Sequence, residues 1–166
     1  GIYYTKDLRG ELTGTIGTSA GAGLKFGPAT SSDVAYESMD LGTNAVGIDH
    51  AGTGTITLTD SDFSNTKDVV ISGSGTVDFI EGTVDTTTVE VTGAGVMNRM
   101  RLLDITLTAD GNAVSDTNIV LTDSSGAQTG SAVTDSSGAA AGLTFTTESV
   151  DSSGVDAKNL AGYQAV

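Results

Sequence analysis

The chain has 166 residues, and its 21 acidic against 7 basic side chains give a formal net charge of −14 at pH 7. Nucleic-acid phosphates and anionic membrane surfaces require a Lys/Arg-rich surface, so we expect neither partner. The absence of cysteine excludes disulfides, zinc–thiolate centres and thiol catalysis. No apolar run approaches membrane-spanning length, so no membrane insertion is expected.

A repeat of about 22 residues begins at the start of the chain. Apolar pairs spaced i, i+2 recur at steps of 22, 22, 23 and 20: Ile2/Tyr4, Leu24/Phe26, Val46/Ile48, Val69/Ile71 and Val89/Val91. A second series follows in phase: Leu12, Val34/Tyr36, Ile56/Leu58 and Val77/Phe79, and a third, weaker one contains Leu41, Phe63 and Val84. Alternation at every second residue indicates strands, and a period of this length indicates stacked units with a shared core. Residues 1–96 are therefore predicted to form a short parallel β-helix.

Glycine recurs between these strands at Gly54, Gly75 and Gly95, in steps of 21 and 20. Glycine readily adopts positive φ, where other residues are strained. We therefore expect one corner of each turn to bend through a positive-φ glycine.

The pattern changes near Met97. Residues 102–108 alternate as an ordinary strand, and the tetrapeptide Asp-Ser-Ser-Gly follows at 123–126, 135–138 and 151–154. Asp-x-x-Gly is a turn signature, and turns 12 and 16 residues apart are typical of short antiparallel strands. Residues 97–166 are predicted to form a small antiparallel β-sandwich, so the fold class of the whole chain is all-β.

Two resemblances follow from these segments. Residues 107–126, with 133–138 and Phe145, resemble the carboxypeptidase regulatory-like (prealbumin-like) β-sandwich modules, although Ala139–Ala141 is an insertion. The chain ends soon after Tyr163, so the last strand of such a module would be missing or supplied by a neighbour. Residues 1–95 are similar, by pattern, to parallel β-helix segments of large microbial surface proteins. Both resemblances imply an extracellular or cell-surface location and a non-catalytic stalk or coat role.

Catalytic residues are not evident. His50, the only histidine, would have to be the base of any Ser–His–Asp apparatus. It lies in a glycine-rich segment, and we interpret it as a solvated turn residue. Paired carboxylates are what glycoside hydrolysis requires, and the stretch that could supply them has only Lys67 as a basic partner. We interpret its acids as a solvent-facing ladder and assign no catalytic residue; they are Asp60, Asp62, Asp78, Glu81 and Asp85.

Calcium is the one cofactor that the sequence suggests. Asp60, Asp62 and Asp68 are oxygen-rich candidates for its ligands, because hard cations prefer carboxylates. They are weak candidates, since the segment lacks the glycine and the spaced glutamate of an EF-hand loop.

Self-assembly is the partner prediction. Ile2, Tyr3 and Tyr4 open the chain already in strand register, Arg99 and Arg101 flank the junction, and Tyr163 lies near the end. We expect these residues to contribute to contacts with other copies. The predicted function is a non-catalytic building block of an extracellular filament, sheath or surface layer.

Two alternatives remain open at this point. One is a receptor- or carbohydrate-binding segment of a viral or cell-surface fibre, for which Tyr36, Phe79 and Tyr163 are the available aromatic side chains. The other is a polysaccharide-active β-helix enzyme.

Overall fold

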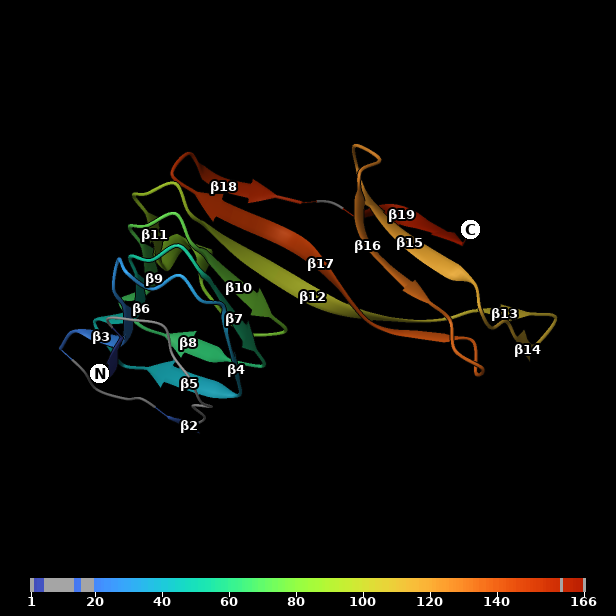
Figure 1. The fold of residues 1–166 in the computed structure, drawn as a ribbon, viewed down its shortest axis with the longest axis horizontal. Coiled ribbons are helices and arrows are strands. Elements are labelled where there is room, and N and C mark those ends of the chain that lie inside the picture. Colours follow the sequence, from blue (N-terminus) through green and yellow to red (C-terminus); the bar gives the residue numbers. More distant parts are fainter. Residues whose placement is uncertain (1, 5–13, 16–19, 159, 166) are drawn as a thin grey trace. The chain divides into compact units, whose positions relative to one another are not determined.

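The structure is a computed structural model that describes residues 2–4, 14–15, 20–158 and 160–165. It is 61% strand and 2% helix, which confirms the all-β prediction (Figure 1). The chain divides into a solenoid unit, Gly1–Arg99 with Glu148–Asp156, and a second unit, Met100–Thr147 with Ala157–Val166. No helix in the described part of the chain is long and apolar enough to cross a membrane.

The solenoid unit contains about four turns of roughly 21 residues, as the repeat predicted. Each turn places strands in stacked parallel sheets (Figure 1). The first sheet has the order β1 (Ile2–Tyr4), β3 (Ala22–Phe26), β6 (Val46–His50), β9 (Lys67–Ile71) and β11 (Val89–Val91). A small sheet contains β2 (Gly14–Thr15), β5 (Met39–Gly42) and β8 (Asp62–Ser64). The remaining sheet begins with β4 (Val34–Glu37), β7 (Thr55–Thr59) and β10 (Thr76–Ile80), and continues through β12 (Val96–Thr106), β17 (Ala139–Asp151) and β18 (Gly154–Ala157).

The register of the first sheet differs from the predicted one at a single step. Leu24 lies opposite Ile48 and Phe26 lies opposite His50, a step of 24 residues instead of 22. Val46, predicted to stack on Leu24, instead lies opposite Ala22. Alternation alone cannot detect this error, because a shift of two residues leaves every side chain on the same face.

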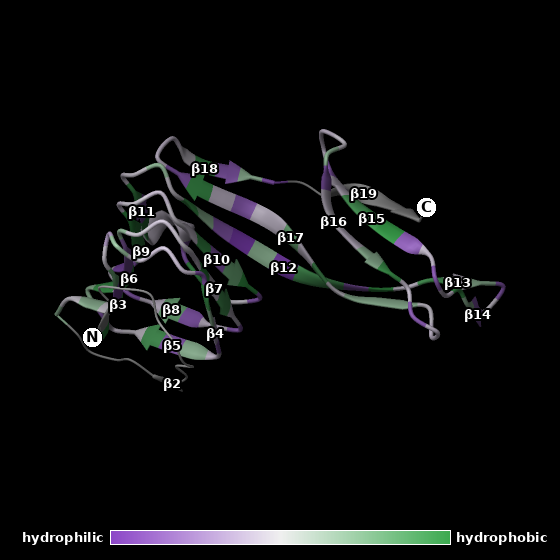
Figure 2. Cartoon of the chain, viewed as in Figure 1, coloured by the Kyte–Doolittle hydropathy of each residue, from purple (hydrophilic) through white to green (hydrophobic). Residues whose placement is uncertain are grey.

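The interior of the solenoid is a continuous apolar column. Ile56 lies between Val34 and Val77 in register, as predicted, and Leu41 lies opposite Phe63. Hydrophobic residues accordingly follow the strands of each turn (Figure 2). The buried members of this core are Leu24, Phe26, Tyr36, Met39, Leu41, Ile48, Ile56, Leu58, Phe63, Val69, Ile71, Val77, Phe79, Val84, Met97 and Val150.

The recurring glycines serve a different purpose from the predicted one. Gly54, Gly75 and Gly95 do not have positive φ; the positive-φ glycines of the described residues lie elsewhere, at 111, 126, 138, 142 and 154. Instead, the turns approach each other closely at this corner. A Cβ on Gly75 would lie 2.5 Å from the carbonyl oxygen of Gly54, and one on Gly73 would lie 2.5 Å from that of Ala51. Glycine is therefore required by stacking distance and not by backbone conformation.

The second unit is antiparallel. β15 (Asn118–Asp123) pairs with β16 (Gln128–Val133) and with β19 (Leu160–Ala165). A short hairpin joins β13 (Thr108–Ala109) to β14 (Asn112–Ala113). A separate small core contains Ile119, Leu121, Ala140 and Leu143.

The Asp-x-x-Gly turns form as predicted. In the first of them, Asp123 Oδ1 accepts hydrogen bonds from the backbone N–H groups of Ser125 and Ala127, and Gly126 has φ 83°. Asp135 makes the same set with Ser137 and Ala139. Hydrogen bonds to the ionised form, led by the following serine hydroxyl, lower the pKa of both carboxyls.

Placing a charge in the apolar column tests this register. Ile56→Asp would bury an unpaired carboxylate between Val34 and Val77, so the free energy of unfolding should fall by at least about 3 kcal/mol. Ala35→Asp, on the exposed face of the neighbouring strand, is the control and should change it little. Urea unfolding followed by circular dichroism measures both, and equal effects would contradict the inward assignment of Ile56.

A methyl group at the glycine corner tests the close approach. Gly73→Ala would push Cβ against the backbone of Gly52 and Ala51, and overpacking of this kind costs about 1–3 kcal/mol. Gly42→Ala is the matched control, because its Cβ would meet only the side chains of Asp40 and Ser64, at 3.2 and 3.4 Å. If Gly73→Ala unfolds at the same urea concentration as Gly42→Ala, the turns are not packed as described.

Candidate functional site

His50 is a core residue and not the solvated turn residue that the sequence suggested. It is 1% exposed and lies in the inward column between Phe26 and Ile71. The Phe26 ring meets it edge-on, with 5.7 Å between ring centroids. The prediction was wrong because the step of 24 residues brings His50, instead of Ile48, opposite Phe26.

The imidazole is fixed by one hydrogen bond. Nε2 lies 2.9 Å from the carbonyl oxygen of Gly54, so Nε2 carries the proton and donates it. Nδ1 is buried and has no hydrogen-bond partner among the described residues. Burial lowers the pKa of His50, although the Gly54 carbonyl and the Asp49 charge oppose the shift. A general base must come within hydrogen-bond reach of its substrate, and this enclosed ring is poorly placed to do so.

The three calcium candidates do not form a ligand set. Asp60 and Asp62 are exposed, whereas Asp68 is 1% exposed. Within the described ranges, no group of three or more His, Asp or Glu side chains is placed to hold a metal ion.

Asp68 instead connects successive turns. Its Oδ1 accepts from the backbone N–H and the Nδ2 of Asn65, at 2.9 and 3.2 Å. Its Oδ2 accepts from the backbone N–H of Asp85 at 3.1 Å, and Asn65 Oδ1 accepts from the N–H of Asn44 at 2.8 Å. A buried carboxylate is tolerated when its oxygens are satisfied in this way. The sequence signal for this network, the Asn44/Asn65 spacing of 21 residues, was missed.

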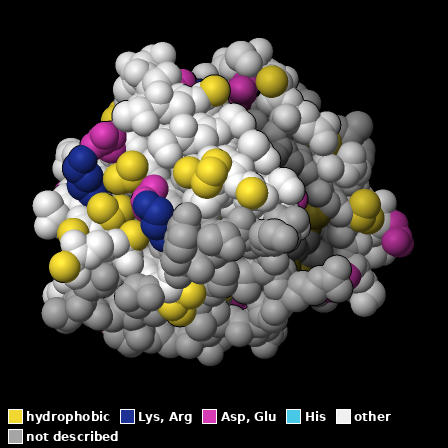
Figure 3. All heavy atoms as spheres, turned by 60° about the vertical axis from the view of Figure 1, so that its left-hand side comes forward, with side chains coloured by type: hydrophobic (Ala, Val, Ile, Leu, Met, Phe, Trp, Pro, Cys, Tyr) yellow, Lys and Arg dark blue, Asp and Glu magenta, His cyan; other side chains and the backbone are white. Residues whose placement is uncertain are grey.

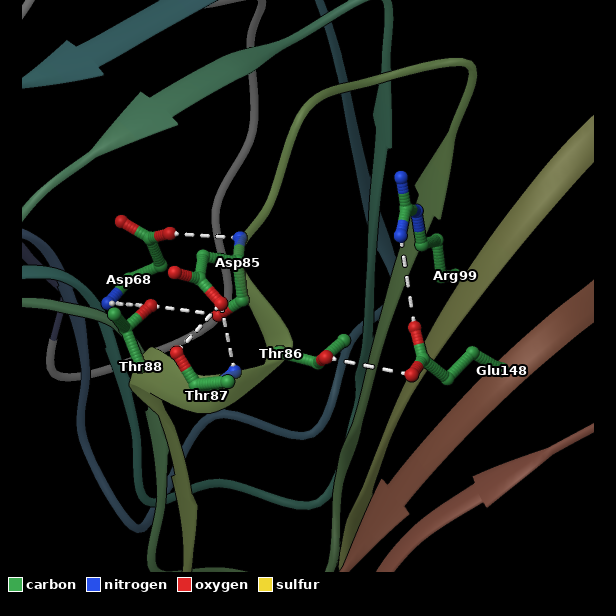
Figure 4. Close-up of polar contacts among 7 residues, drawn as sticks. All are labelled: Asp68, Asp85, Thr86, Thr87, Thr88, Arg99 and Glu148. Atoms are coloured by element: carbon green, nitrogen blue, oxygen red, sulfur yellow. Dashed lines mark hydrogen bonds and ion pairs between the residues drawn. The ribbon is translucent and has the colours of Figure 1, made fainter.

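The last turn ends in a capped 3₁₀ helix, η1 (Thr86–Thr88) (Figure 4). Asp85 Oδ1 accepts from the N–H and the hydroxyl of Thr87, at 2.9 and 2.7 Å. These bonds lower the pKa of Asp85. The Asp85 carboxylate is therefore engaged in closing the turn.

Arg99 joins this end of the solenoid to β17. Its Nη1 lies 3.6 Å from Glu148 Oε2, and the other oxygen of Glu148 accepts from the Thr86 hydroxyl at 3.3 Å (Figure 4). Arg99 thus makes an ion pair inside the solenoid unit, and Arg101 is half-buried on the same strand.

The remaining acids of the predicted ladder differ in environment. Asp78 is half-buried and accepts from Asn98 Nδ2 at 2.8 Å. Burial raises the pKa of Asp78, and the Asn98 bond opposes the shift. Asp78 is thus bound to an amide rather than to a second carboxylate.

Ion pairs also cross the turns on the outer face of the first sheet. Lys25 pairs with Asp49, and Lys67 pairs with Glu90. Figure 3 shows basic side chains beside acidic ones on a face that also exposes hydrophobic groups. Exposed pairs of this kind contribute little to stability individually.

The residues predicted for assembly are only partly described. Ile2 is partly buried against the solenoid core. The backbones of Tyr3 and Tyr4 pair with β3, and that of Tyr163 pairs with Leu121, but the side chains of these tyrosines lie outside the described set. Their role in assembly stays a prediction.

The carbohydrate-binding alternative loses two of its aromatic side chains. Tyr36 is 4% exposed and Phe79 is 0% exposed, and both belong to the solenoid core. Neither is available to stack on a sugar.

Comparisons of the chain with protein-family models, with curated proteins and with solved structures found no match.

Removing one acceptor from Asp68 tests the network between turns. Whichever way the amide of Asp68→Asn turns, a backbone N–H of Asn65 or Asp85 loses its oxygen. An unsatisfied buried donor should lower the free energy of unfolding by about 1–3 kcal/mol. Asp62→Asn, which removes an exposed carboxylate, is the control. Equal urea midpoints for the two variants would contradict the role assigned to Asp68.

Proposed function

We propose that this chain is a non-catalytic structural building block of an extracellular filament, sheath or surface layer, which assembles through strand edges and stacked turns. The observation that carries the proposal is the outer edge of β11, the last strand of the first sheet. The extracellular setting and a sandwich fold for the second unit rest on the resemblances in the sequence.

The edge of β11 has unpaired backbone groups. Thr92 N–H donates to the Ile71 carbonyl at 2.9 Å, so residue 92 faces β9. In a parallel strand, the N–H and C=O of one residue point to the same side, and successive residues alternate. Val89 and Val91 therefore direct their N–H and C=O groups away from β9. No strand of the described chain pairs with this side of β11.

The apolar column is also less covered here. Val89 and Val91 are only partly buried, whereas Val69 and Ile71, one turn earlier, are 0% exposed. An edge with unpaired backbone groups beside apolar side chains favours addition of a further strand. A strand of a second copy, continuing the parallel stack, would satisfy both.

The polar groups support a structural role. The buried or capped side chains that suggested chemistry make bonds within or between turns: His50 with Gly54, Asp68 with Asn65 and Asp85, and Asp85 with Thr87.

Blocking the edge of β11 tests the proposal. Val91→Pro removes the N–H that faces the open side and leaves the Thr92–Ile71 bond in place. Val91→Thr is the matched control, because it is β-branched and keeps the N–H. Sedimentation velocity and negative-stain electron microscopy should find concentration-dependent polymers of the parent and of Val91→Thr. These should grow with salt, which screens the charge of −14.

Val91→Pro should remain monomeric with an unchanged circular dichroism spectrum. A parent that stays monomeric at every concentration and salt, or a Val91→Pro variant that polymerises equally well, would refute assembly through this edge.

A further inference from the structure

We propose that His50 makes the solenoid acid-responsive, so that its middle turns loosen when the surroundings become mildly acidic. This inference goes beyond the building-block role and does not depend on it, because the device lies inside one copy of the chain.

The geometry leaves no place for a second proton on the ring. Nε2 already donates to Gly54, so a proton added to the imidazole must go to Nδ1. That nitrogen is buried and has no hydrogen-bond partner among the described residues. Protonation would therefore place a charge and an unsatisfied donor in an apolar column, which is strongly unfavourable.

The ring has little freedom to escape. Phe26 and Ile71 lie in register on either side of it. A Cβ on Gly75 would overlap Nε2, so the neighbouring turn touches the ring directly. Movement of His50 towards solvent requires movement of the glycine corner that stacks the turns.

Charged groups on the adjacent first-sheet strands do not compensate. Asp49 alternates with His50 along β6, so its side chain points to the opposite face, where it pairs with Lys25. On β9, Lys67 is exposed and pairs with Glu90. Asp68 is buried but already accepts from Asn65 and Asp85.

The strands across the core also present no charge to His50. The side chains that β7 and β10 bury are Ile56, Leu58, Val77 and Phe79, and β4 buries Tyr36. Nothing in the described interior stabilises an imidazolium ion.

The direction of the pH effect follows from linkage. An unfolded histidine takes up its proton near pH 6.5, whereas burial lowers the pKa in the folded chain. His50 therefore leaves stability intact above pH 6.5 and reduces it as the pH falls below that value. Ordinary carboxyls titrate near pH 4. Asp78, whose pKa is raised by burial, has the opposite sign and does not weaken the fold as the pH falls.

The sole histidine gives a direct measurement on the unmodified chain. In an NMR titration from pH 7.5 to 5, the ring signals should keep the neutral Nε2–H tautomer below pH 6.5. Hydrogen exchange, corrected for intrinsic rates, should show amides of β6 and β9 losing protection towards pH 5. The second unit has no histidine and serves as an internal control. A ring that titrates freely near pH 6.5, with no loss of protection in β6 and β9, would overturn the proposal.

Two variants isolate the contribution of His50. His50→Gln keeps a donor for Gly54 without titrating, and His50→Leu replaces the ring by an apolar side chain. Between pH 6.5 and 5, the unfolding equilibrium constant of the parent should rise, relative to either variant, by up to about tenfold per pH unit. Identical pH dependence in parent and variants would overturn the proposal. If neither variant folds, the NMR titration of the parent decides.

Discussion

The structure depends on one constraint: each residue of a turn lies directly against its counterpart in the next turn, at the spacing of neighbouring strands, about 4.8 Å. A position in the turn is therefore a column, and every member of it must tolerate the same neighbours. The inward positions are apolar because they stack on one another. The corner residues Gly52, Gly73 and Gly93 have no side chain because a Cβ would meet the backbone of the turn before.

The same constraint explains what the sequence could and could not reveal. Alternation and period are properties of single columns, so the strands of the solenoid and the stacking of Ile56 on Val77 were predictable. The step from Leu24 to Ile48 depends on how many residues a corner absorbs, which alternation does not record. This one step turned His50 from an expected surface residue into a core residue. The glycine column was visible in the sequence, but its cause was spatial proximity between residues of successive turns.

Polar residues inside the stack follow a matching rule: each must find its partner in its own turn or in the next. Asn44, Asn65 and Asp68 do so as a chain of hydrogen bonds, and acids at predicted metal positions proved to include one of these links. His50 satisfies the rule with only one of its two nitrogens. At β11 the columns run out of counterparts, so the backbone and the apolar interior meet the surroundings together. Pairing between turns, response to acid and growth by addition of strands would thus have a common physical origin.

The register around His50 is the most direct test, because it is the feature that alternation could not supply. Nuclear Overhauser effects from the His50 ring protons should connect to the Phe26 ring, to the Ile71 methyl groups and to the α-protons of Gly75. Effects connecting Val46 to Leu24 instead, with a His50 ring that has no contact to Phe26 or Ile71, would contradict the stacked columns described for this chain.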